Sequence, residues 1–532
     1  MSRALLLLAC LAPALLPAQF GEQITVRLVE VPVRVTDAEG NAIVRLSKED
    51  FRLLEDGQPQ EITHFYEVAD SAIARRQFAD FVAQRGLPAR DPETRKRVVL
   101  FMDSTRLHPL NYQRLASALE GYLATAVVPG DEVAVFGSQP SLRTLLPWTA
   151  DPERVRAFLR GYFPTGSRVT GGIGRSRMVE EMIVSGRNYQ MALAQVRGYC
   201  VELKNEYQAS LDAMRSVMEF TAGLPGRKHF VYVGEGFTTI PGLEYFYMLE
   251  KRWPTRPSLS EASVYDLSPA FRELGLFAAS KGFTVTAVET RGLQTGNAQN
   301  DVEIGARDDL YGLEVTAVSA ARRAARDSLV LLAEPSGGRA IDNTNDLTAP
   351  LGRAALESNH YYILAYQPRH PADGKTRALA VTMANPEFKV TARRGYTDFT
   401  EEDDLSSRLQ AAVLWDAPLE NPLGIRAELG EGKKEGKFVL APLRVLLPRA
   451  GLAFPGGVAS VRLGVVTASE GKKSDTFVQK LTFEESAWGD KPVLAYPLTL
   501  KMRSGEHDLV AAVQEADGRV SLVKLEAGSS RK

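Results

Sequence analysis

Between residues 97 and 288, short apolar runs alternate with helical segments, and this alternation constrains the fold more than any other feature of the chain. Apolar runs separated by helices are typical of βαβ units, in which successive strands run parallel. We therefore expect a mostly parallel sheet with helices on both faces. The runs that should form its strands are 97–102, 132–136, 229–233 and 283–288.

Ligands bind to sheets of this kind beyond the carboxyl ends of the strands. Four residues that follow the expected strands should lie at this edge, namely Asp103, Gly137, Glu235 and Glu289. The first strand ends in Asp103-Ser104-Thr105, which would present a carboxylate and a hydroxyl there. Oxygen donors of this type suit a hard divalent cation.

A chain of 532 residues is too long for one hydrophobic core, so we expect several domains. Residues 24–35 alternate apolar and polar side chains with period two, and turns at 37–41 and 56–57 separate this run from further short strands. We therefore expect an N-terminal β module at 22–67, followed by a linker at 68–96. The α/β domain should span 97–345, with a β hairpin region at 346–398. Short, regularly spaced strands at 405–528 predict a C-terminal β-sandwich.

Within the α/β domain we expect two long surface loops that flank a long helix. Residues 163–186 are rich in Gly, Ser, Arg and Thr, and residues 238–268 are rich in aromatic residues and proline. The helix should cover residues 187–222. Loops at the carboxyl edge of such a sheet commonly carry binding residues, so both loops are candidates for contact with a partner.

The first residues have the pattern of a secretory signal peptide. A basic head that includes Arg3 precedes an apolar run, and Ala18 supplies a small residue for cleavage, so the signal peptide should span residues 1–18. Pro13 and Pro17 interrupt the run, which argues against a membrane-spanning helix. We expect an exported protein, periplasmic, cell-surface-associated or secreted, without a transmembrane segment after cleavage.

The composition of the chain and the motifs that it lacks exclude several classes of function. Lys and Arg total 64 against 65 Asp and Glu, and a net charge of -1 gives no field that would attract nucleic acid. The sequence has no Gly-x-Ser-x-Gly motif, no phosphate-binding loop and no His-x-x-x-His pair. Only Cys10 and Cys200 are present, so the mature chain should have no internal disulfide. We therefore expect a binding protein and not an enzyme.

The order of several short motifs resembles that of von Willebrand factor A-related proteins of the type common in acidobacterial genomes. The motifs are 31–37, 51–57, the strand that ends at Asp103, 129–135, 224–228, 289–293, 336–339, 361–368 and 393–396. The resemblance covers about residues 24–396. It implies a doubly wound, Rossmann-type central domain. Better-known relatives bind Mg²⁺ or Mn²⁺ through an Asp-x-Ser-x-Ser strand end, a Thr and an Asp, and an acidic residue of the partner completes the coordination.

Carried over by position, the resemblance implies a degenerate metal-ion-dependent adhesion site. Asp103 matches the first position of the motif and Thr105 the second, whereas Leu107 stands at the third and cannot bind a metal. Ser210 or Thr170 would supply the hydroxyl of the second loop. Glu235 would replace the aspartate of the third.

No cofactor is certain from the sequence, and Mg²⁺ or Mn²⁺ is the candidate. The expected function is protein–protein interaction or adhesion through the loops at the carboxyl edge, with a partner that offers an acidic residue. The alternative is a metal-free structural or scaffold component of a cell-envelope or secreted assembly.

Overall fold

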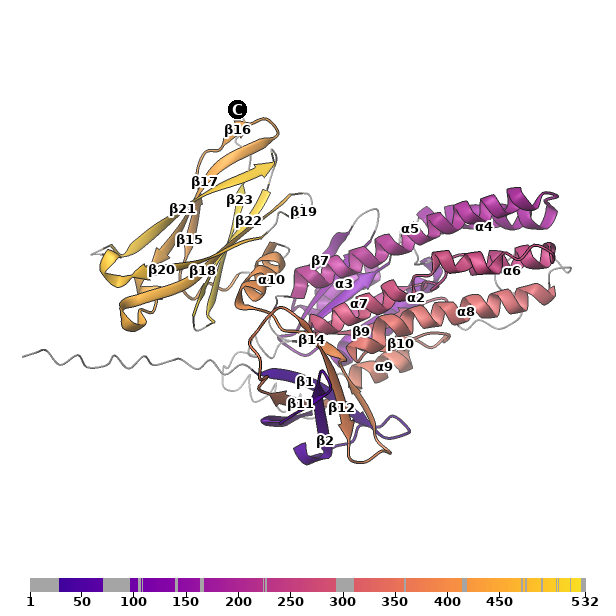
Figure 1. The fold of residues 1–532 in the computed structure, drawn as a ribbon, viewed down its shortest axis with the longest axis horizontal. Coiled ribbons are helices and arrows are strands. Elements are labelled where there is room, and N and C mark those ends of the chain that lie inside the picture. Colours follow the sequence, from indigo (N-terminus) through magenta and orange to yellow (C-terminus); the bar gives the residue numbers. More distant parts are fainter. Residues whose placement is uncertain are drawn as a thin grey trace, which may run out of the picture.

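The computed structural model describes most of the chain and shows three regions (Figure 1). The described residues are 28–69, 96–103, 107, 109–138, 142–162, 167–222, 224, 227–292, 311–357, 360–413, 419–469, 472–473, 476–488, 491–503, 505, 507–516 and 518–527. The expected signal peptide and nearly all of the expected linker lie outside these residues. No helix within them is long and apolar enough to cross a membrane.

The α/β domain contains a six-stranded sheet in the order β10-β9-β8-β5-β6-β7. All neighbouring pairs are parallel except β6 with β7. The predicted strands are all present, and every residue of β5 is buried. The strands are β5 (Lys96–Met102), β6 (Glu132–Gly137), β7 (Arg143–Thr149), β8 (Arg227–Gly234), β9 (Phe283–Glu289) and β10 (Arg339–Ile341).

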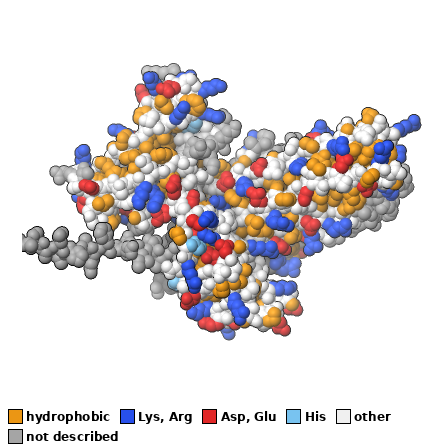
Figure 2. Space-filling view, viewed as in Figure 1, with side chains coloured by type: hydrophobic (Ala, Val, Ile, Leu, Met, Phe, Trp, Pro, Cys, Tyr) orange, Lys and Arg blue, Asp and Glu red, His pale blue; other side chains and the backbone are white. Residues whose placement is uncertain are grey.

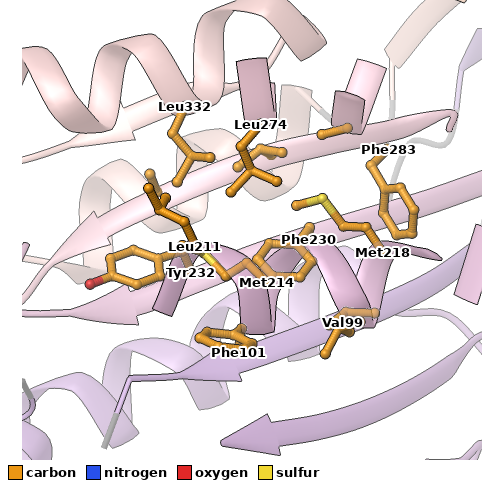
Figure 3. Packing of buried hydrophobic residues seen from close by; sticks show 14 of the residues in the cluster. Val99, Phe101, Leu211, Met214, Met218, Phe230, Tyr232, Leu274, Phe283 and Leu332 are labelled. Carbon is orange, nitrogen blue, oxygen red and sulfur yellow. The ribbon is translucent and has the colours of Figure 1, made fainter. Parts of the chain in front are cut away.

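Helices cover both faces of this sheet because alternate side chains of each strand point to opposite sides. Val98 and Leu100 face one layer and Val99 and Phe101 the other. The first layer contains α2 (Pro109–Ala126), α3 (Pro152–Gly161) and α9 (Thr348–Glu357). The second, part of which is drawn in Figure 3, contains α5 (Tyr189–Ala222), α7 (Ser268–Ser280) and α8 (Tyr311–Ala333).

The two predicted loops are largely helical, so this prediction was wrong. Helix α4 (Ser167–Ser185) fills most of the first segment, and α6 (Leu243–Arg252) with a 3-10 helix (Leu259–Tyr265) fills much of the second. Together with the predicted long helix α5, they form a separate hydrophobic cluster that includes Leu193 and Phe246. Burial in this cluster outweighs the weak local helix propensity of glycine-rich sequence. Helices α4, α5, α6 and α8 extend side by side away from the sheet (Figure 1).

The N-terminal strands and the strands of the 346–398 region form one β domain instead of two separate units. One four-stranded sheet has the order β13-β1-β11-β4 and the other β14-β12-β2-β3. Val31 of β1, for example, pairs with Leu364 of β11. The strands are β1 (Val29–Thr36), β2 (Phe51–Glu55), β3 (Gln58–Gln60), β4 (His64–Ala69), β11 (His360–Tyr366), β12 (Thr376–Met383), β13 (Lys389–Ala392) and β14 (Gly395–Thr397).

A buried network of polar side chains lies in the core of this β domain. Glu55, which is 5% exposed, accepts hydrogen bonds from the hydroxyls of Tyr396 (2.6 Å) and Tyr366 (2.8 Å). Its Oε1 also lies 3.2 Å from Nε2 of His370. Burial opposes ionisation of Glu55, but the hydrogen bonds outweigh it and hold the pKa of Glu55 below its ordinary value.

We expect this network to make the protein sensitive to acid. Because the pKa of Glu55 is lower in the folded state, its stabilising effect is present above the ordinary value of 4.5 and is lost as pH falls through the folded pKa. Denaturant unfolding between about pH 6 and about pH 3 should therefore show a steeper loss of unfolding free energy in the wild type than in Glu55→Gln. Equal slopes for the two proteins would contradict this role.

Residues after 400 form a helix and the predicted β-sandwich. One sheet has the order β15-β17-β16 with β21 paired to β17, and the other β19-β18-β22-β23 with β20 paired to β18. Their inner faces share a core that includes Leu443, Leu463 and Trp488. The strands are β15 (Arg426–Leu429), β16 (Lys433–Glu435), β17 (Phe438–Pro448), β18 (Val458–Ser469), β19 (Lys472–Lys473), β20 (Phe477–Glu484), β21 (Val493–Arg503), β22 (His507–Glu515) and β23 (Val520–Ala527).

Helix α10 (Glu401–Val413), which the sequence did not predict, connects the sandwich to the α/β domain. Its Leu405 and Leu409 belong to a cluster with Val466 and Val510 of the β18–β22 sheet. The same helix contacts α5 on its other side. Helix α10 therefore packs between the sandwich and the α/β domain and joins the two by side-chain contacts on both of its sides.

Candidate functional site

Asp103 lies at the carboxyl edge of the parallel sheet and is fully buried. Its backbone N–H donates to the carbonyl of Val233 (2.8 Å), which extends the pairing of β5 with β8 by one residue. The Ser138 hydroxyl donates to Oδ1 and the Tyr232 hydroxyl to Oδ2, each at 3.2 Å. The two strands that flank β5 thus each bring a hydroxyl to this carboxylate.

Gly234 leaves the space that this arrangement needs. A Cβ at this position would lie 2.5 Å from the Tyr232 hydroxyl oxygen and 3.1 Å from Cβ of Asp103. The Tyr232 ring is fully buried, so it has little room to move aside. A side chain at residue 234 would therefore separate the tyrosine hydroxyl from Asp103.

Glu235 follows β8 at the same edge and is half-buried. Its Oε1 accepts a hydrogen bond from Nδ2 of Asn111 in the first turn of α2 (2.9 Å). Oδ1 of Asn111 in turn accepts from Nη2 of Arg114 (2.9 Å), which also approaches the carbonyl of Thr290 at 3.3 Å. A chain of polar contacts therefore runs from β8 across α2 to the end of β9.

A third carboxylate, Glu289, ends β9 and pairs with Arg291. Nε of Arg291 donates to Oε1 of Glu289 at 2.5 Å. Burial lowers the pKa of Arg291, but the carboxylates of Glu289 and Glu235 outweigh it and raise the pKa above its ordinary value. The edge is therefore an array of paired charges and hydrogen-bonding groups in which the arginine stays protonated.

The structure brings together part of the predicted ligand set. Asp103 and Glu235 follow two neighbouring strands of the sheet. Ser210 is buried in α5 and has no side-chain hydrogen bond within the described part of the chain. Thr105 lies outside the described residues, as does the side chain of Thr170, which falls in α4 and not in a loop.

Leu107 occupies a different environment from the one that the motif implies. Its side chain is fully buried in the cluster between the sheet and α2, together with Leu115 and Leu119. A serine at this position would place a hydroxyl in a hydrophobic core. Leu107 therefore contributes to the packing of α2 on the sheet.

Sequence reasoning missed Ser138, Tyr232 and Asn111. Ser138 follows the strand that ends at Gly137, a position that the strand assignment already placed at this edge. The contact of Tyr232 with Asp103 is tertiary and has no local signal. Among the described residues, no three His, Cys, Asp or Glu side chains group closely enough to hold a metal ion. The oxygen donors of Asp103, Ser138 and Glu235 nonetheless have the chemistry that Mg²⁺ accepts.

The chain has low similarity to several solved structures. No family model matches the sequence, and no curated protein matches it. Proximal thread matrix protein 1 from the mussel byssus is 12% identical with a TM-score of 0.24, and the match covers 49% of this chain and 47% of that protein. BatB from Bacteroides thetaiotaomicron is 11% identical (TM-score 0.23, covering 50% and 98%).

The von Willebrand factor domain of the type V pili tip protein Mfa5 from Porphyromonas gingivalis is 12% identical with a TM-score of 0.24, and the match covers 49% of this chain and 94% of that domain. TM-scores of this size do not assign a fold. The fold of this chain therefore follows from its own strand pairing and packing.

Proposed function

We propose that the chain is an exported, non-catalytic binding protein that contacts a protein partner through the carboxyl edge of its six-stranded sheet. The observation that carries this proposal is the convergence of Asp103, Ser138, Asn111 and Glu235 at that edge. They come from three strand ends and from α2. Edges of this kind are where ligands of parallel sheets bind. Over the face shown in Figure 2, acidic and basic side chains are interspersed, which suits a protein partner better than nucleic acid.

In this proposal the central domain is a doubly wound domain of the von Willebrand factor A type with a degenerate metal site. Asp103, Ser138 and Glu235, together with Thr105, would hold Mg²⁺ or Mn²⁺. The bound ion would supply an electrophilic position for an acidic side chain of the partner. Ser138 orients the carboxylate of Asp103, and Asn111 orients that of Glu235.

A metal-free scaffold within a cell-envelope or secreted assembly is the second candidate. The observation that favours it is that both oxygens of Asp103 already accept hydrogen bonds, from Ser138 and Tyr232. A carboxylate held in this way can brace the ends of three strands without a metal. In that case the partner surface would be built by the β domain and the sandwich.

Thermal unfolding of the mature chain in EDTA, Mg²⁺, Mn²⁺ and Ca²⁺ separates the two functions. A cation that binds only the folded state adds about 2.7 kcal/mol when its concentration is 100 times its Kd. We expect Mg²⁺ or Mn²⁺ to raise the melting temperature of the wild type. Asp103→Asn, which keeps the shape of the side chain, should abolish the shift.

Asp131→Asn is the matched control because Asp131 is also fully buried but lies at the opposite edge of the sheet. Its oxygens accept from the backbone N–H groups of Lys96 (2.8 Å) and Val128 (3.0 Å). Asp131→Asn should lower stability yet keep the cation-dependent shift. Loss of the shift in both variants, or in neither, contradicts a metal site at Asp103. No shift in the wild type favours the scaffold.

A further inference from the structure

A cavity lies at the amino edge of the six-stranded sheet, opposite Asp103, where the β domain packs on the α/β domain. Its volume is about 80 Å³. The charged residues that line it are all arginines, two from each domain, and no Asp or Glu is among its described lining residues. The arginines are Arg34 and Arg393 of the β domain and Arg227 and Arg339 of the α/β domain.

These arginines belong to four motifs that are far apart in the sequence, at 31–37, 224–228, 336–339 and 393–396. Arg227 and Arg339 begin the parallel strands β8 and β10, so both side chains start from the amino edge. Arg34 lies in β1, and Arg393 directly follows β13, which pairs with β1. The fold therefore gathers into one cavity four arginines that are far apart in the sequence.

Contacts with the protein hold several of these guanidinium groups in place. Nη2 of Arg34 donates to the carbonyl of Gly337 at 2.5 Å. The guanidinium carbon of Arg227 lies 3.7 Å from the centre of the Tyr361 ring, a stacking geometry that fixes the plane of the guanidinium. The cationic groups are thus positioned before any ligand arrives, which lowers the entropic cost of binding.

Arg393 is the least satisfied of the four. Its Nη2 donates to the carbonyl of Glu30 at 2.7 Å. Its Nε is buried and has no hydrogen-bond partner within the described part of the chain. A buried donor without an acceptor is costly, so an acceptor at this place would stabilise the folded protein.

His229 is a buried histidine of the same cavity. It lines the cavity, is 4% exposed, and stays neutral because burial, followed by the charges of Lys96, Arg227 and Arg34, holds its pKa well below the ordinary value. A neutral histidine can still donate one hydrogen bond to a ligand. The site therefore offers fixed positive charge together with neutral donors.

We propose that this cavity binds a small oxyanion, namely phosphate or the phosphate group of a small ligand. Guanidinium groups bind phosphate oxygens through paired, charge-assisted hydrogen bonds. One water molecule needs about 10–15 Å³ measured in the same way, so the cavity has room for a tetrahedral anion with a few waters. An anion bound there contacts arginines of both domains and fastens the β domain to the amino edge of the sheet. This site is separate from the proposed partner-binding edge.

The test compares thermal unfolding of the full mature chain in sodium phosphate and in sodium chloride at equal ionic strength, with equilibrium dialysis against radiolabelled inorganic phosphate. We expect saturable binding of phosphate and a melting temperature several degrees higher in phosphate. Arg393→Gln should weaken phosphate binding at least tenfold and remove the difference in melting temperature.

Arg394→Gln is the matched control. The neighbouring Arg394 has a side chain that is 64% exposed, lies 3.8 Å from Glu334 and does not line the cavity. This variant should bind phosphate as the wild type does. Equal loss of binding in both variants would show that phosphate responds to overall charge and would overturn the proposal.

A second variant guards against misfolding of Arg393→Gln. Arg339→Gln removes an arginine from the other side of the cavity and should weaken phosphate binding in the same way, while far-UV circular dichroism reports on the fold. Glycerol phosphate tests the source of the phosphate, because competition with inorganic phosphate shows that the phosphate group alone is recognised. If the wild type binds neither compound and each variant lowers the melting temperature equally in chloride and phosphate, the arginines serve only as interdomain contacts.

Discussion

Replacing Gly338 by alanine should lower the unfolding free energy by about 3 kcal/mol or more, at the upper end of what overpacking costs. A Cβ on residue 338 would collide with the backbone carbonyl oxygen of Val285 in the adjacent strand β9. The position of a Cβ is fixed by its own backbone and the Val285 oxygen is a backbone atom, so no side-chain rotation relieves the clash. Gly337, directly before it, has φ of +72° and would place a Cβ 3.1 Å from the carbonyl carbon of Ala392. The turn into β10 is therefore held between two strands.

The control for this prediction is Gly352→Ala in helix α9. A Cβ at residue 352 would meet nothing within 4 Å. Alanine in a helix interior is favoured over glycine by about 0.5–1 kcal/mol, so this variant should be slightly more stable than the wild type. Urea unfolding of the three proteins measures both effects. A change in Gly338→Ala of less than about 1 kcal/mol would mean that β9 and β10 can separate without loss, contrary to the packing described here.

The strands of the α/β domain could be predicted because each is buried on both faces and so appears as a continuous apolar run. β5, with all seven residues buried, is the clearest case. The edge strands were missed for the same reason. β7 exposes Arg143 and Thr144 and contains a proline, and β10 has only three residues, so neither forms such a run.

The partners of the strands were harder to predict than the strands themselves. The alternating pattern at 29–36 correctly indicates a strand with one buried face. The residues that lie beside that face in the same sheet, such as Tyr362 and Leu364, belong to β11, and nothing local in either segment identifies the other as its partner. For this reason the N-terminal module and the 346–398 region were expected to be separate.

The candidate site shows the same division between local and tertiary information. Asp103 and Glu235 could be placed at the carboxyl edge because each follows a predicted strand within two residues. The hydroxyls on Asp103 come from Ser138 and Tyr232, which are brought there by the pairing of β6 and β8 with β5. Ser210 was proposed from the resemblance alone, and within the described part of the chain no hydrogen bond joins it to either carboxylate.

The arginine cavity had no sequence signal of its own. None of the four motifs contains a long run of basic residues, and the chain as a whole is nearly neutral with a net charge of -1. Only the packing of the β domain on the amino edge of the sheet brings the four charges together. A net charge near zero is compatible with a small positive cavity, because the sum over the chain does not describe how the charges are distributed.

The second large effect concerns the buried ion pair between Arg97 and Glu132. These residues are paired across β5 and β6, and Nε of Arg97 lies 2.9 Å from Oε2 of Glu132. Their side chains are 1% and 10% exposed. Glu132→Gln leaves the guanidinium buried without this carboxylate, and we expect a loss of about 3 kcal/mol of unfolding free energy. Glu120→Gln, which removes the partner of the exposed Arg160, should change stability little because water screens that pair.

A double replacement distinguishes the cost of an unpaired charge from the loss of packing. Removing both charges together, as in Arg97→Met with Glu132→Leu, removes the desolvation cost of both groups and keeps most of the volume, so the double variant should recover most of the stability lost in Glu132→Gln. Denaturant unfolding of the single and double variants gives the coupling between the two positions. If the double variant is less stable than Glu132→Gln, the two side chains stabilise the fold in another way than by neutralising each other's charge. Recovery would mean instead that Glu132 stabilises the central sheet mainly by neutralising the buried charge of Arg97.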